Sequence, residues 1–321
     1  MADETDDPPE GGGTHPPLSL SIVIPTHNRP ERVLALLTSL ASTPIDGLAR
    51  IVLVDDSTQP VDYRTRFPSL PIDHLVLPER VFISHAKNLG WTRAQSDLVY
   101  FIDDDNVVTP ETFRRPLAAM AADPGLGAIV PAVLYRRRPD LVWVYATPLA
   151  PDGWGHTLVG RNRPRAPLLE GKLLDTDALP NASLVRKAAF EGIGGFSEDL
   201  VVNSSADAAL RLKRAGWKVH ADTGAFIYHD VDPPGEFGYW AQHGVADPER
   251  VYYEVRDWFL LMRSIHRGEI LFAVRATYHA LGFLLPNGTT YLLRGGAGGR
   301  ASFRSLLTGY LSGLRATSRL A

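Results

Sequence analysis

The stretch Leu98-Val-Tyr-Phe-Ile-Asp103-Asp104-Asp105-Asn106 determines how the rest of the chain is interpreted. An apolar run followed at once by three carboxylates is typical of a buried strand that carries acids at its carboxyl end. In an open α/β sheet, ligands bind in the crevice outside the carboxyl ends of the strands. Adjacent carboxylates repel one another, so we expect a cation among them, and an all-oxygen site suits Mg²⁺ or Mn²⁺. The alternative is a solvated acidic turn that precedes a helix beginning near Pro110.

The segments on either side of this stretch alternate between predicted strands and helices. We expect strands at 18–24 (ended by Pro25), 51–54, 72–77 and 128–133, and helices from Arg29, at 85–94 and at 110–122. Such alternation predicts a doubly wound, mostly parallel α/β sheet. Residues 135–175 show no clear period and are predicted to form a long loop that binds an acceptor, because long loops often carry function. Core elements are expected again at 182–185, 205–215 and 224–228.

Composition limits the classes of protein that fit. The chain has 321 residues, 45% of them hydrophobic, a formal net charge of −3 and no cysteine. The charge gives no support for a nucleic-acid partner. The lack of cysteine excludes disulfides and thiolate metal sites and is consistent with a cytoplasmic location.

Three regions are predicted along the chain. Residues 1–17, rich in Asp, Glu, Pro and Gly, are expected to be a flexible tail and not a signal peptide. Residues 18–245 form the α/β domain. Residues 246–321 form a helical, basic amphipathic extension, and no run approaches the roughly twenty apolar residues of a spanning helix.

The C-terminal extension has two interpretations. From Arg250 onward, arginines greatly outnumber acids and alternate with aromatic and aliphatic residues. This pattern suits peripheral binding to an anionic membrane surface, such as the inner face of the cell membrane. The same pattern also fits helices that pack on the main domain with their arginines exposed.

Polar side chains follow the first two strands at the edge where the three aspartates lie. Pro25, Thr26 and Asn28 follow one strand, and Asp55 and Asp56 the next, so these groups could bond a base or a ribose. They could equally cap a helix and begin a turn. Lys87 could reach a phosphate or could be solvated. The loop lacks the glycines of a dinucleotide fold or P-loop, which disfavours a nucleotidyltransferase.

Taken in order, these segments resemble the family 2 nucleotide-sugar glycosyltransferases of the GT-A fold. The resemblance covers about Ser19 to His229. The matching segments are Ile22–Pro30, Val54–Ser57, Ala86–Gly90, Phe101–Asp105, Leu179–Arg186, Gly194–Glu198, Leu210–Trp217 and His229.

The resemblance implies transfer of a sugar from a nucleoside diphosphate to a glycan or a polyprenyl-linked acceptor, as in cell-envelope polysaccharide synthesis, with inversion. Asp103 and Asp105 would be the Asp-X-Asp pair that holds Mg²⁺ or Mn²⁺, with His229 as a further ligand. Asp104 would contact the ribose. The remaining nucleotide-sugar residues would be Pro25, Thr26, Asn28, Asp55, Asp56 and Lys87.

One departure from the family pattern concerns the catalytic base. Where many members carry Glu-Asp-X-Asp, this chain has Ser204 and Ser205, and an unassisted serine cannot act as a base near neutral pH. Asp207, Asp199 or Glu198 could replace the missing acid, or His229 or a substrate phosphate could activate the acceptor. Asp207 could instead form an i, i+4 pair with Arg211. A catalytically impaired nucleotide-sugar-binding protein is the remaining alternative.

Overall fold

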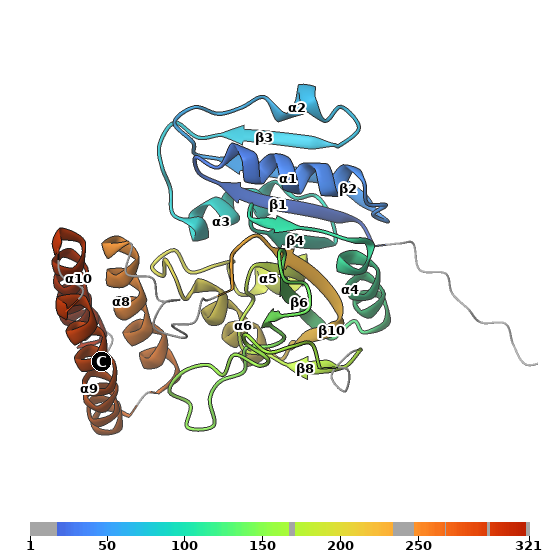
Figure 1. Cartoon of the computed structure of the whole chain (residues 1–321). Helices are drawn as coiled ribbons and strands as arrows, with labels where there is room; N and C mark the ends of the chain where they lie inside the picture. The colour runs from blue at the N-terminus through green and yellow to red at the C-terminus, as the bar shows by residue number, and fades with distance from the viewer. Residues whose placement is uncertain (1–17, 167–170, 234–246, 267, 294–295, 319–321) are drawn as a thin grey trace, which may run out of the picture.

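The computed structural model describes residues 18–166, 171–233, 247–266, 268–293 and 296–318. It confirms the predicted α/β class, with a central sheet between helices and three further helices toward the C-terminus (Figure 1). The strands are β1 (Leu20–Thr26), β2 (Leu48–Asp55), β3 (Ile72–Val76), β4 (Leu98–Ile102), β5 (Asn106–Val107), β6 (Leu126–Tyr135), β7 (Val142–Val144), β8 (Leu173–Asp175), β9 (Ala182–Arg186) and β10 (Lys218–His229). The helices are α1 (Pro30–Ala41), α2 (Tyr63–Arg66), α3 (Ile83–Arg93), α4 (Pro110–Ala122), α5 (Lys187–Gly192), α6 (Ser204–Arg214), α8 (Pro248–Ile265), α9 (Glu269–Leu293) and α10 (Gly296–Ser318).

The strand order brings the predicted site residues to one edge. Neighbouring strands follow the order β3-β2-β1-β4-β9-β6-β10-β5. Strands β3, β2, β1 and β4 are parallel, and β9 lies antiparallel between β4 and β6. The carboxyl ends of β1, β2 and β4 therefore lie side by side, as the parallel arrangement requires.

Helices cover both faces of the sheet because its strands are buried on both sides. Ile22 and Ile24 of β1 pack with Leu36 of α1 and Phe113 of α4. Val23 points to the other face, where α3, α5 and α6 contribute Ala86, Phe190 and Leu212, among others. Apolar residues on every strand position are expected for a sheet covered on both faces.

Helix α3 lies unusually close to β1. A side chain at Gly90 would collide with Val23, so only glycine permits this approach. The close packing fixes the position of Lys87, one turn earlier in α3, beneath the carboxyl edge of the sheet.

Several predicted elements differ from those observed. Strand β1 continues through Pro25 to Thr26, because its pairing with β4 has already ended at Val23 and Pro25 pairs only with β2. Strand β10 begins at Lys218, six residues before the predicted start. An irregularity between Asp222 and Phe226 divides it into two halves, and the prediction covered only the second half. Within 135–175, β7 and β8 add short strands to β6 and β10.

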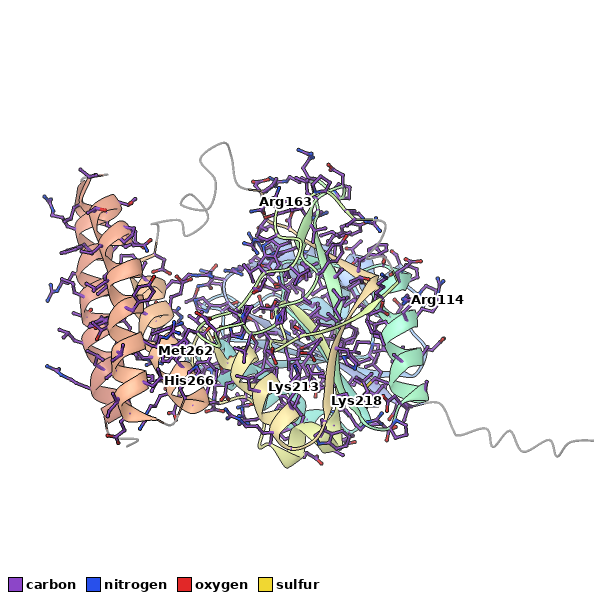
Figure 2. All side chains as sticks on the ribbon, turned by 90° about the horizontal axis from the view of Figure 1, so that it is seen from below. Arg114, Arg163, Lys213, Lys218, Met262 and His266 are labelled. Carbon is purple, nitrogen blue, oxygen red and sulfur yellow. The ribbon has the colours of Figure 1, made fainter. Side chains whose placement is uncertain are left out.

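The C-terminal helices stack outward from the α/β domain. Val251, Val255 and Phe259 of α8 pack in one cluster with Trp154 and Leu210 of the domain. The cluster also contains Phe272 of α9 and Leu306 of α10. Figure 2 shows α9 and α10 at the outer side, with Met262 of α8 and His266, which follows α8, where the helices meet the domain. Among the described residues, none of the helices has the length and apolar character needed to cross a membrane.

Candidate active site

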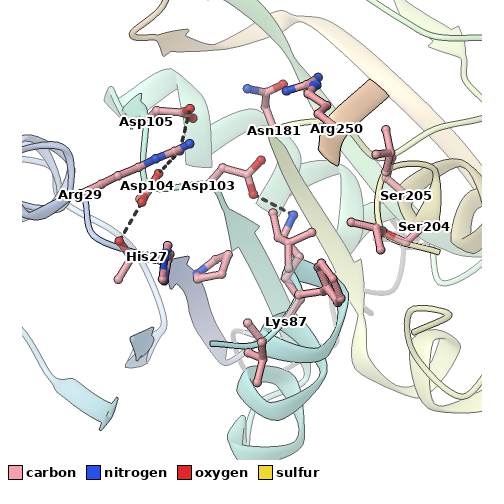
Figure 3. Close-up of a pocket in the computed structure, with 18 of the residues that line it drawn as sticks. His27, Arg29, Lys87, Asp103, Asp104, Asp105, Asn181, Ser204, Ser205 and Arg250 are labelled. Atoms are coloured by element: carbon pink, nitrogen blue, oxygen red, sulfur yellow. Dashed lines mark hydrogen bonds and ion pairs between the residues drawn. The ribbon is translucent and has the colours of Figure 1, made fainter. Parts of the chain in front are cut away.

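A cavity of about 580 Å³ opens at the carboxyl edge of the sheet. Its walls come from the ends of β1, β2, β4 and β10, from α3, from the turn before β9, and from the first turns of α6 and α8. This volume is typical of a site for a small organic ligand. Figure 3 shows Asp104 and Asp105 on one wall and Ser204 and Ser205 on the opposite one.

The three aspartates point in three directions, and each carboxylate has its own cation. Asp103 Oδ1 lies 2.7 Å from Lys87 Nζ, and Asp104 Oδ1 accepts a 3.2 Å hydrogen bond from Arg29. Asp105 Oδ2 accepts a 2.9 Å bond from Arg32. Figure 3 shows Arg29 between Asp104 and Asp105. The repulsion expected among adjacent carboxylates is therefore offset by basic side chains.

Burial affects two of these carboxylates differently. Burial raises the pKa of Asp104 to about 6, against the hydrogen bond from Thr26 and the charge of Arg29. Burial also acts to raise the pKa of Asp105. The hydrogen bond and charge of His229, with the charge of Arg32, outweigh it and leave that pKa below the ordinary value.

The predicted metal ligands come together only in part. Asp105 Oδ1 lies 3.4 Å from His229 Nε2, and His229 Nδ1 is buried without a hydrogen-bond partner. Asp103 faces Lys87 instead, so within the described residues no group of three or more His, Asp or Glu side chains is arranged to hold a metal. The donor chemistry fits a divalent ion between Asp105 and His229, with Asp103 available once Lys87 moves aside.

The predicted nucleoside residues divide into those that line the cavity and those that support it. Pro25, Thr26 and Asp56 line it. Asn28, in the left-handed region with φ of 52°, lies outside the lining, and its Oδ1 accepts from Thr58.

Asp55 also lies outside the lining and is almost fully buried. It accepts hydrogen bonds from His74 Nε2 and Ser57 N. Burial acts to raise its pKa, but these bonds outweigh that effect and hold it below its usual range. Asn28 and Asp55 therefore fix the two loops that carry Thr26 and Asp56.

The acids predicted to replace the missing base do not reach the cavity. Asp207 accepts a 2.7 Å bond from Arg211 Nε and is absent from the lining. Glu198 accepts from Asn88 and contacts His85, also away from the cavity. Ser204 and Ser205 do line it. Asp207 is engaged by Arg211 four residues later on the same helix, as the alternative i, i+4 interpretation expected, and Glu198 is engaged by Asn88 and His85 of α3.

Several lining residues were not predicted from the sequence. Trp143 of β7 contacts His229 edge to face at 5.1 Å, and Asn181 adopts a φ of 49° before β9. Glu249, Arg250 and Tyr253 come from α8. A signal existed for Asn181, since it lies in the segment Leu179–Arg186, which resembles the glycosyltransferase family.

Helix α8 is held against the cavity by one buried acid. Asp257 Oδ2 accepts hydrogen bonds of 2.6 and 2.8 Å from the backbone N–H groups of Val201 and Val202. Val201 and Val202 themselves line the cavity. The first turns of α8 therefore belong to the site, although the sequence places them in a separate extension.

A mostly parallel doubly wound sheet with acids at the carboxyl end of β4 and a histidine facing them defines the class of GT-A glycosyltransferases. A sequence model described as "Glycosyl transferase family 2" matches residues 21–194, more than half of the chain. The chain belongs to that family.

Curated relatives match part of the chain. An N-acetylglucosaminyltransferase of Mesorhizobium japonicum is 30% identical over an alignment of 131 residues that covers 38% of this chain and 29% of the relative. The first two curated relatives are covered over only 37% and 29% of their own lengths.

Solved structures share the fold over nearly the whole chain. S. aureus TarS residues 1–349 in complex with UDP-GlcNAc superposes with a TM-score of 0.55 at 16% identity, covering 95% of this chain and 84% of that one. Mannosyltransferase PcManGT from Pyrobaculum calidifontis, in complex with GDP-Man and Mn²⁺, gives 0.52 at 18% identity, with 92% and 87% covered. These similarities establish the GT-A fold.

Proposed function

We propose that this chain is a metal-dependent glycosyltransferase that moves a sugar from a nucleoside diphosphate to a glycan or a polyprenyl-linked acceptor. One observation carries the proposal: Asp103, Asp104 and Asp105 share a single cavity with Asp56 and His229. The ligands of the two structural neighbours, a nucleotide sugar in each and Mn²⁺ in one, support it.

The nucleotide side of the cavity has a polar, preorganised wall. Asp56 is fixed by a 2.6 Å bond from Val81 N and by His27 Nδ1 at 2.8 Å, so its orientation suits a base or ribose. Thr26 holds Asp104 through a 2.7 Å bond. Lys87 and Arg29 line the cavity beside the aspartates and would contact a diphosphate placed between these acids and α3.

Asp105 and His229, with Asp103, would hold Mg²⁺ or Mn²⁺. When bound, the ion would neutralise charge that develops on the departing diphosphate. Arg29 and Arg32 pair with Oδ2 of Asp105, while its Oδ1 faces His229.

The acceptor side is formed by Ser204, Ser205 and the start of α8, and Glu249 is the proposed proton acceptor. Asp56 has both oxygens engaged, and Asp247 accepts from Glu249 N as the cap of α8. Glu249 has only a 3.5 Å contact with Arg80 and a side chain that is 46% exposed. It would take the hydroxyl proton as the acceptor oxygen bonds to the anomeric carbon and the bond to the diphosphate breaks. A single displacement of this kind inverts the anomeric centre.

The test measures release of nucleoside diphosphate from a panel of UDP- and GDP-sugars with Mn²⁺ and with chelator. We expect turnover that requires the metal and falls about a hundredfold in Asp105→Ala, since several kcal/mol of stabilisation are lost. Turnover that persists in chelator and in the variant would contradict the metal role. Tight nucleotide binding by calorimetry without any transfer would instead identify a catalytically impaired binding protein.

A further inference from the structure

The outer face of α9 carries a continuous apolar surface. Six large side chains on it are between 52% and 84% exposed. At about 100° per residue they fall within roughly a quarter of the helix circumference. The residues of this α9 stripe are Ile270, Val274, Tyr278, Leu281, Leu285 and Leu292.

The opposite face of the same helix is already occupied. Phe272, Ala276 and Tyr291 are buried in the cluster that joins α8, α9 and α10 to the domain. The α9 stripe is therefore not the core-facing side of the helix. In both Figure 1 and Figure 2, α9 and α10 stand at one edge of the molecule, on the side away from α4. Soluble monomers rarely expose an apolar strip of this length, roughly 33 Å along the helix.

The C-terminal segment that carries the stripe has a strongly positive net charge. Residues 269–321 contain six arginines and one acid, Glu269, a net charge of +5. The whole chain counts 33 Lys and Arg against 36 Asp and Glu, so residues 1–268 count 27 against 35, a net charge of −8. Arg300 and Arg304 are exposed on one face of α10, in line with exposed Leu307, Leu311 and Leu314.

We infer that α9 and α10 dock on the surface of an anionic phospholipid bilayer, with the α9 stripe in the acyl boundary and the α10 arginines among the headgroups. Exposed apolar and basic side chains on two neighbouring amphipathic helices are what such binding requires. A second copy of this chain fits less well, because face-to-face contact would bring two surfaces of the same positive charge together. This inference does not depend on the proposed transfer reaction.

The experiment is flotation of the full chain with vesicles of phosphatidylcholine, alone or mixed with phosphatidylglycerol. We expect binding to the anionic vesicles, at least about tenfold weaker binding to pure phosphatidylcholine, and loss of binding as salt is raised. Ile270→Ser/Val274→Ser/Tyr278→Ser should abolish flotation. Arg300→Gln/Arg304→Gln should weaken it and reduce its salt dependence.

Matched controls lie on the α/β domain. Val76→Ser/Leu158→Ser/Leu173→Ser removes three exposed apolar side chains outside the stripe, and Arg114→Gln/Arg163→Gln removes two exposed arginines. Both controls should float like the parent chain. Circular dichroism and melting curves check that each variant is folded.

Three outcomes would overturn the inference. The first is absence of flotation with anionic vesicles. The second is flotation that the folded stripe variant retains. The third is a concentration-dependent dimer, seen by sedimentation, that the stripe variant dissociates, which would assign the surface to a second copy of the chain.

Discussion

At the scale of single residues, the site is an acidic cluster whose charge is already compensated. Lys87, Arg29 and Arg32 each hold one carboxylate of the Asp103–Asp105 run. The same cations lie within the cavity wall or directly behind it, so an incoming diphosphate and a divalent ion would together replace these internal pairs. A bound donor would therefore exchange one set of ion pairs for another, rather than bring unpaired charge into the cavity.

The residue that most needs a test is Glu249. Glu249→Gln should lower kcat by about 10² to 10⁴, because a general base contributes in that range. Adding Ser205→Asp to that variant should restore part of the rate by placing a carboxylate on α6, across the cavity. Transfer rates with saturating donor and acceptor measure both effects.

The control for Glu249 is Glu111→Gln, which removes a partly exposed acid on α4, away from the cavity. Its rate should match that of the parent chain. An unchanged rate in Glu249→Gln would remove Glu249 from the mechanism and leave substrate-assisted activation as the explanation.

The sequence predicted part of the cavity lining and missed the rest for a physical reason. Pro25, Thr26, Asp56 and Lys87 follow strands or lie on a helix next to the sheet edge, so local pattern was enough to place them together. Trp143 and Tyr253 reach the cavity only because distant segments fold back onto it. Their roles, like those of all the predicted site residues, stay predictions until variants are assayed.

At the scale of elements, the sequence predicted the order of strands and helices but not every boundary. Helix α4 begins at Pro110 and ends at Ala122 as predicted, because its proline start and apolar spacing are local signals. The length of β10 and the continuation of β1 through Pro25 depend on which neighbour each strand has at each residue. These neighbours belong to segments far apart in the sequence, so a local pattern does not predict them.

The contacts of Glu198 with Asn88 and His85 of α3 predict a pH-dependent contribution to stability. The hydrogen bond from Asn88, and to a smaller extent that from His85, holds the pKa of Glu198 below its ordinary value. A depressed carboxyl pKa stabilises the fold above the unfolded pKa, near 4.5, and the effect disappears as pH falls through the folded value. Because the side chain is half exposed, Glu198→Ala should cost only about 0.5 kcal/mol at neutral pH.

Urea unfolding of the Glu198→Ala variant at several pH values measures this effect. The difference from the parent chain should shrink toward zero in acid, and kcat should be unchanged. Glu191→Ala, which removes a half-exposed acid on α5, is the control. A large loss of kcat with unchanged stability would instead place Glu198 in the chemistry.

At the scale of the whole molecule, acidic and basic side chains are concentrated in different parts of the chain. The α/β domain carries the acids of the cavity, and the C-terminal helices carry arginines with an exposed apolar surface. Helix α8 joins the two, since Glu249, Arg250 and Tyr253 line the cavity while Phe259 packs against α10. A change at α8 therefore affects both the cavity and the outer helices.

Ligand binding to the intact chain should be visible as thermal stabilisation that requires metal and nucleotide together. A ligand present at about 100 times its Kd adds roughly 2.7 kcal/mol to the folded state, which corresponds to a rise in Tm of about 5 °C for a chain of this size. Nucleoside diphosphates with Mn²⁺ should produce this shift, and the base that gives the largest rise identifies the donor class. Asp105→Ala should keep only the metal-independent part of the shift, whereas Asp46→Ala, an exposed loop acid, should behave like the parent chain. If Mn²⁺ adds nothing to the stabilisation of the parent chain, so that the parent and the Asp105 variant behave alike, the nucleotide binds without an ion at this position.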